Sequence, residues 1–110
     1  MGAIIPLMSA PVRVTAATKQ ELRLAVPVSQ YNQLDFLLNI YEGTNVAVKI
    51  ITGMQTQSED GWQDLGSFSA TLDATNSEKQ SFSNPLAFIR WHVTSSGNAT
   101  FLITGVARLT

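Results

Sequence analysis

The chain has 110 residues, of which 45% are hydrophobic and 14% are charged, and its formal net charge is −1. This length suits one domain and leaves no room for a second. Ordinary globular domains carry about 25% charged residues. A chain this poor in charge must cover its surface with neutral polar side chains or hide part of that surface against partners.

The same composition excludes several classes of partner and site. The seven Lys and Arg residues are scattered from Arg13 to Arg108, whereas a phosphate backbone is bound by clustered positive charge. The absence of cysteine excludes a disulfide framework and thiolate-bound zinc. No apolar run approaches the roughly 20 residues that cross a bilayer, and the N-terminal stretch lacks the basic region of a signal peptide. We therefore expect no nucleic-acid partner and no membrane insertion.

Residues 1–11 are expected to form an extended arm that precedes a single domain over residues 12–110. Pro6 and Pro11 forbid a continuous helix in the arm. Its apolar side chains are poorly suited to water, so we expect them to contact other protein surface. They are Ile4, Ile5, Leu7 and Met8. Three arrangements of the arm remain open. It could fold back on its own domain, dock on a neighbouring subunit, or stay disordered.

Eight strands are predicted from alternating apolar residues and intervening turns, in chain order over 12–17, 21–28, 34–41, 46–51, 62–72, 79–82, 87–94 and 99–108. The third and fourth runs are joined by Glu42-Gly43-Thr44-Asn45 and have the pattern of a β-hairpin. A kink is expected at Gly66. Helical periodicity is missing, so the pattern predicts an all-β, antiparallel β-sandwich, specifically an eight-stranded jelly roll.

The last two predicted strands can be assigned faces by their two-residue period. The inward set should contain Ile89, Trp91, Val93, Phe101 and Ile103, with Gly105 continuing it where the backbone passes close to a neighbour. The outward set combines apolar and charged residues: Phe88, Arg90, His92, Leu102 and Val106. A mixed face of this kind suits protein–protein contact.

The residues offer little for catalysis or metal binding. His92 is the only histidine and lies mid-strand, where a surface or interface role is favoured over a general base. An acidic turn contains Glu59, Asp60 and Asp64, which raises the question of a calcium ion. Its spacing matches no EF-hand loop, and acidic turns are common for solubility alone. We expect no enzymatic activity, no metal and no cofactor.

Three aromatic residues support a different hypothesis. Trp62, Tyr31 and Tyr41 could stack on sugars if they shared one exposed surface. Tryptophans in a small sandwich more often belong to the core, and Trp91 is already predicted to point inward. A shallow carbohydrate-binding site therefore stays the alternative hypothesis.

Two segments of the C-terminal half carry a resemblance to a known group of proteins. The turn Ser58-Glu59-Asp60-Gly61-Trp62-Gln63-Asp64-Leu65-Gly66 is followed by Phe88-Ile89-Arg90-Trp91-His92-Val93-Thr94 and a final strand beginning at Ala99. This order resembles small β-sandwich virion proteins of tailed bacteriophages. A similar theme occurs in galactose-binding-like sandwiches, which include carbohydrate-binding modules. The resemblance brings no catalytic residue with it.

The resemblance implies a structural or adhesive role as a capsid decoration protein, a head or tail component, or a binder of the host surface. With the composition, it leads us to expect a non-enzymatic virion protein. Its expected partners are further copies of itself, with a trimer favoured, and a capsid or other assembly surface. Contacts are expected through Ile4, Ile5, Leu7, Met8, Phe88, Arg90 and His92.

Overall fold

The computed structural model describes residues 2–5, 7–69, 72–95 and 97–110. The expectations that fall on Pro6, and on residues 70–71 near the end of the predicted 62–72 strand, lie outside these ranges.

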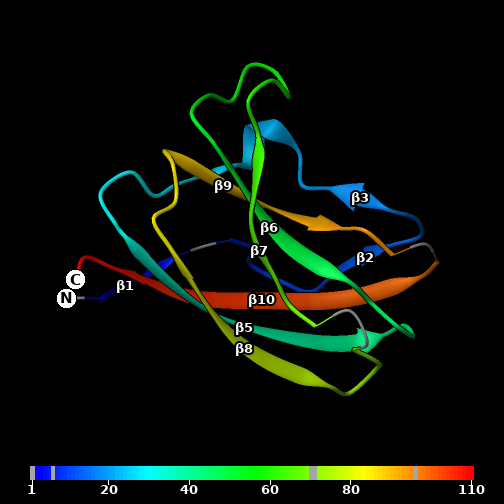
Figure 1. Ribbon diagram of the computed structural model, residues 1–110. Coiled ribbons are helices and arrows are strands. Elements are labelled where there is room, and N and C mark those ends of the chain that lie inside the picture. Colours follow the sequence, from blue (N-terminus) through cyan, green and yellow to red (C-terminus); the bar gives the residue numbers. More distant parts are fainter. Residues whose placement is uncertain (1, 6, 70–71, 96) are drawn as a thin grey trace.

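Within the described ranges, ten strands form two antiparallel sheets that face each other (Figure 1). Sheet A contains β1 (Gly2–Ile5), β2 (Val12–Val14), β5 (Gln33–Glu42), β8 (Ser77–Ser83) and β10 (Ala99–Arg108). Sheet B contains β3 (Thr18–Lys19), β4 (Val26–Pro27), β6 (Val48–Gly53), β7 (Gln63–Ser67) and β9 (Phe88–Val93). A 3₁₀ turn, η1 (Leu22–Leu24), precedes β4. The predicted antiparallel β-sandwich is confirmed.

The strand order is that of a jelly roll. Sheet A has the order β1-β10-β5-β8 with β2 also on β10, and sheet B has the order β3-β9-β6-β7 with β4 also on β9. β1 and β2 are two pieces of one interrupted strand, and so are β3 and β4. Counted this way, the eight strands follow the orders first-eighth-third-sixth and second-seventh-fourth-fifth, the two-sheet arrangement of jelly rolls.

The core lies between the sheets because each long strand presents alternate residues to it. Along β5, Leu34, Phe36, Leu38 and Ile40 are buried. The inward sets predicted for β9 and β10 are buried as expected: Ile89, Trp91, Val93, Phe101 and Ile103. The rings of Trp91 and Phe101 meet edge to face with centroids 5.1 Å apart, a favourable aromatic geometry that links sheet B to sheet A.

The predicted hairpin between residues 34–41 and 46–51 is wrong. Both runs are strands, but β5 pairs with β10 and β8 in sheet A, while β6 pairs with β9 and β7 in sheet B. The segment between them crosses from one sheet to the other. Alternation identifies a strand with one buried face. It does not say whether that strand pairs with the next strand in the same sheet or packs against it from the opposite sheet.

The predicted strand over 21–28 is also wrong in its first part, which forms η1. Where this strand is interrupted, the Gln20 side chain takes its place beside β9. The Trp91 backbone N–H donates a hydrogen bond to Gln20 Oε1 (3.2 Å), and Gln20 Nε2 donates to the Leu7 carbonyl (3.1 Å). The Gln20 side-chain amide thus satisfies a backbone N–H of β9 beside the interruption and a backbone carbonyl of the N-terminal arm.

The N-terminal arm folds back on its own domain. β1 pairs antiparallel with β10, from Gly2 opposite Arg108 to Ile5 opposite Gly105. Ile5 and Leu7 are 7% and 2% exposed and belong to the core. Of the three arrangements that the sequence left open, the structure therefore has the one in which the arm packs on its own domain.

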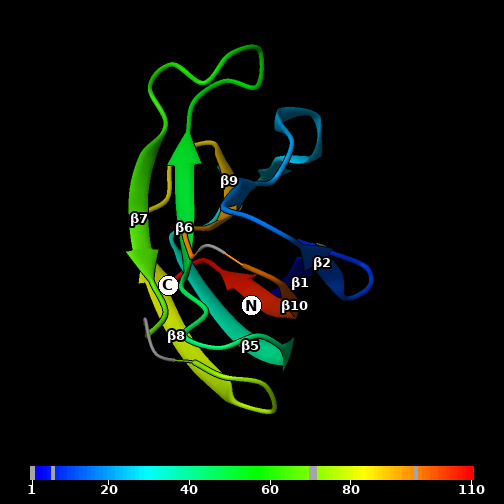
Figure 2. The same ribbon diagram turned by 90° about the vertical axis from the view of Figure 1, so that its right-hand side faces the viewer.

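The loop between β6 and β7 extends away from sheet A in both views of the molecule (Figure 1, Figure 2). It contains Glu59 and Asp60 of the acidic turn. The expected kink at Gly66 corresponds to a shift in register, since Ile50 is opposite Gly66 and Ile51 is opposite Asp64. Leu65 therefore forms a bulge in β7.

Candidate interaction surface

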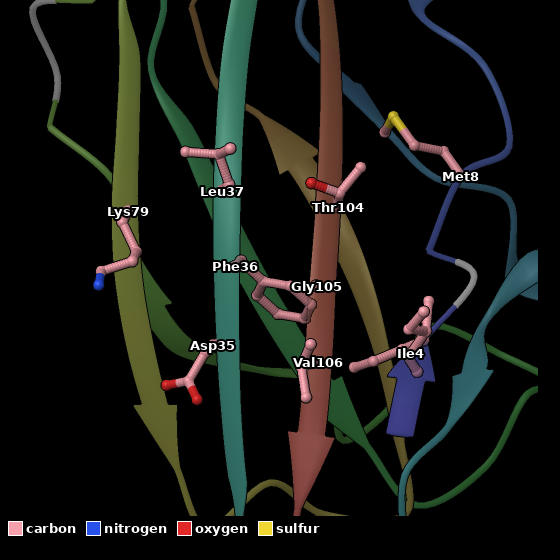
Figure 3. Close-up of a pocket in the computed structure, with 10 residues that line it drawn as sticks. Ile4, Met8, Asp35, Phe36, Leu37, Lys79, Thr104, Gly105 and Val106 are labelled. Carbon is pink, nitrogen blue, oxygen red and sulfur yellow. The ribbon is translucent and has the colours of Figure 1, made fainter. Parts of the chain in front are cut away.

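The outer face of sheet A carries exposed apolar side chains on three adjacent strands. Ile4 of β1 is opposite Val106 of β10, and Thr104 of β10 is opposite Leu37 of β5. Ile4 is 85% exposed, Leu37 40% and Val106 38%. Figure 3 shows these side chains around a shallow hollow, with Met8 at its margin. We call this set the sheet A patch: Ile4, Met8, Leu37, Thr104 and Val106.

The hollow has a volume of about 690 Å³, and its floor is formed by Gly105 and Phe36. A Cβ atom at Gly105 would overlap the Phe36 ring. The absence of a side chain at this position therefore lets the ring of β5 pack beneath β10. This confirms the expectation that the backbone passes close to a neighbour at Gly105.

The carboxylate of Asp35, beside the sheet A patch, is neutralised by neighbouring side chains. The Asp35 carboxylate accepts hydrogen bonds from Ser81 Oγ (2.6 Å) and Gln33 Nε2 (3.2 Å), and it forms an ion pair with Arg108. The Ser81 hydrogen bond, with help from Gln33 and Arg108, holds the pKa of Asp35 below its ordinary value. Lys79, opposite Leu37 on β8, takes part in none of the ion pairs found among the described residues.

Of the four arm residues expected to make contacts, only Ile4 and Met8 remain at the surface. Ile5 and Leu7 are used in the core of their own domain. Met8 is half-buried, and its sulfur accepts a hydrogen bond from the Ile103 backbone N–H (3.2 Å). This contact bridges the gap between β1 and β2 along the edge of β10.

The three predicted contact residues of β9 lie on sheet B, away from Val106 and Leu102 on sheet A. The expectation of one outward face that combines residues of the last two strands is therefore wrong. Phe88 and His92 are half-buried, while Arg90 is only 1% exposed. Arg90 does point away from the core, but the β6–β7 loop covers it, so the structure corrects its assignment as a surface contact.

Arg90 is held by three residues from two other segments, the β6–β7 loop and the stretch after β3. Its Nη1 and Nη2 atoms donate to the two Glu59 carboxylate oxygens (2.9 and 3.0 Å), and its Nε donates to the Gln20 carbonyl (2.7 Å). The guanidinium lies 4.8 Å from the Trp62 ring centroid, a cation–π distance. These contacts fasten the β6–β7 loop to β9, a structural role that β-alternation alone does not reveal.

The acidic turn is engaged in ion pairs. Glu59 also lies 3.6 Å from Lys19, and Asp64 pairs with Lys49 at 3.0 Å. Hydrogen bonds from Arg90, with the charges of Arg90 and Lys19, lower the pKa of Glu59. In the part of the chain that the structure describes, no three His, Cys, Asp or Glu side chains are grouped to hold a metal ion.

The three aromatic residues of the carbohydrate hypothesis are not brought together. Tyr31 precedes β5 and packs on the core, while Tyr41 lies at the far end of β5 and is 52% exposed. Ten extended residues span about 33 Å, so the two tyrosines lie at opposite ends of the sheet. Trp62 belongs to the β6–β7 loop on sheet B.

Comparisons with known proteins give a structural likeness but no likeness in sequence. No family model matches the chain, and no curated protein matches it. The crystal structure of the SPBc2 prophage-derived protein YomS is similar, with a TM-score of 0.47 and 16% sequence identity over 91% of this chain and 96% of that one. Among the described residues, no helical segment has the length and hydrophobicity of a membrane span.

The sequence pattern predicted that Val106 points outward, but Leu37 was not predicted to lie on the interaction surface. A usable signal was present in the third predicted strand, because Leu37 shares its outward set with Asp35, Asn39 and Tyr41. An apolar residue among polar ones on the solvent face marks a half-exposed surface. The pairing that places it near Ile4 required the strand order.

Proposed function

We propose that the protein is a non-enzymatic structural subunit of a larger assembly, and more specifically a virion component of a tailed bacteriophage, such as a capsid decoration protein. It associates with itself and binds a shell surface. The observation that supports this most is the sheet A patch, where exposed Ile4 and Val106 are opposite each other and Leu37 is exposed on the next strand. Contiguous apolar surface of this kind is typical of interaction sites.

The charge pattern supports the same function. Four ionisable side chains of sheet A form two local pairs, Asp35 with Arg108 and Glu42 with Arg13, and Lys79 at the edge adds a single charge. Such pairs leave a nearly neutral face that can be covered without burying isolated charges, which would be costly. The virion assignment itself rests on the resemblance carried by the Asp60-Gly61-Trp62 turn and the Phe88–Val93 strand.

The test is the mass of the purified protein in solution, measured by light scattering over a concentration series. The proposal expects a defined homo-oligomer, and the sequence favours a trimer. A strict monomer whose tryptophan fluorescence changes on titration with sugars would instead support the carbohydrate-binding alternative.

A further inference from the structure

We propose that the outer face of sheet A seats the same face of a second copy of this chain, related by a two-fold axis. This inference rests on the proposed function and names both the partner and the surface. It starts from the distribution of exposed apolar side chains. Ile4, Leu37, Tyr41 and Val106, all of sheet A, are four of the seven large apolar residues found exposed among the described ones.

The area of this face matches what a specific dimer needs. β5 and β10 each have ten residues, which gives a length of about 33 Å, and four strands side by side are about 19 Å wide. The footprint is therefore roughly 600 Å² on each copy. A pair would bury about 1,200 Å², the lower end of the range for stable, specific interfaces.

The shape of the face favours a copy of itself. A β-sheet has a right-handed twist, and two sheets of the same twist pack face to face with their strands about 30° apart. An identical sheet supplies this matching surface by definition. The side chains of the sheet A patch stand where two such faces would interdigitate.

The charges of the face allow self-pairing. Its two ion pairs, Asp35–Arg108 and Arg13–Glu42, lie toward opposite ends of β5 and are each neutral. On the edge strand β8, Lys79 adds one positive charge beside Leu37. A long lysine stem can lie along an apolar surface while its ammonium stays in water, so two copies meet without burying like charges.

The pairing is isologous, since each copy contributes the same patch. It therefore predicts a dimer, or assemblies built from dimers, instead of the trimer that the sequence favoured. The stoichiometry separates this inference from the more general proposal of self-association.

The test compares three single variants with the wild-type protein by sedimentation velocity over a concentration series. Leu37→Glu and Ile4→Glu place a charge in the patch, and the change at Ile4, which is 85% exposed, should have little effect on folding. Met54→Glu is the matched control, because Met54 is 67% exposed but lies in the β6–β7 loop next to sheet B. Circular dichroism melts establish that each variant is folded.

The expected result is a wild-type dimer whose dissociation constant rises at least about tenfold, or about 1.4 kcal/mol, in Leu37→Glu and Ile4→Glu but not in Met54→Glu. A trimer, or a dimer that both patch variants leave unchanged, would overturn this inference while leaving self-association intact. A wild-type monomer at every concentration would overturn self-association in the proposed function as well.

Discussion

Arg90 and Glu59, 31 positions apart in the sequence, meet in a two-pronged ion pair with N–O distances of 2.9 and 3.0 Å. The Arg90 side chain is 1% exposed and the Glu59 side chain is 51% exposed. The pair therefore fixes a loop at the protein surface to a residue that water does not reach.

Replacing Glu59 with Gln should lower the free energy of unfolding by about 1–3 kcal/mol, because it leaves a buried guanidinium without its charge partner. Water reaches one side of the loop, which keeps the loss below that of a fully buried pair. The control is Glu21→Gln, whose pair with Arg23 is exposed on both sides and should contribute about 0–1 kcal/mol. Urea denaturation measures both, and equal losses would contradict the structural role of Arg90.

His92 should make the protein less stable in mildly acidic solution. Burial, and then the positive charges of Lys49 and Lys19, lower the pKa of His92 below its ordinary value of 6.5. The unfolded chain then binds the proton more readily than the folded one, so stability is lost as the pH falls below 6.5. In unfolding experiments at about pH 8 and about pH 5.5, His92→Gln should lose less stability than the wild type. An identical loss in both would show that His92 does not contribute.

Leu7 and Ile4 belong to the same arm but should respond very differently to truncation. Leu7→Ala removes a side chain that is 2% exposed, which costs about 2–5 kcal/mol in protein cores. Ile4 is 85% exposed, so Ile4→Ala should change the stability by at most about 0.5 kcal/mol. Comparable effects in thermal or chemical unfolding would mean that the arm does not fold back as described.

Gly105→Ala should destabilise the protein by about 1–3 kcal/mol, the usual cost of overpacking, because the new methyl group would overlap the Phe36 ring. Replacing the Phe36 ring with the smaller leucine side chain makes room for the methyl group. The double variant Gly105→Ala, Phe36→Leu should therefore be more stable than the sum of the two single effects predicts. Strict additivity in a double-mutant cycle would argue against this contact.

The sequence predicted the strands and their buried faces well, because both follow from the two-residue period of alternation. Ile89, Trp91 and Val93, and Phe101 with Ile103, were placed correctly on this basis. It did not predict which strands pair, because pairing in a jelly roll joins residues far apart in the chain. The false hairpin between β5 and β6 is the clearest example.

The candidate surface was predicted less well for the same reason. Arg90 has the sequence position of an outward residue, and only the return of the β6–β7 loop buries it. Ile4 and Leu37 become neighbours of Val106 and Thr104 through the pairing of β1, β10 and β5. Neither the covering loop nor this strand order leaves a local pattern in the sequence.

Hydroxyl-radical footprinting at low and high protein concentration tests the central claim most directly, since it reports which side chains another copy covers. We predict that Ile4, Leu37 and Val106 become protected as the concentration rises, while Met54 on the β6–β7 loop stays equally reactive. The account would be contradicted if the reactivity of the sheet A patch did not change with concentration. This holds whether Phe88 and His92 on sheet B become protected instead or no residue becomes protected.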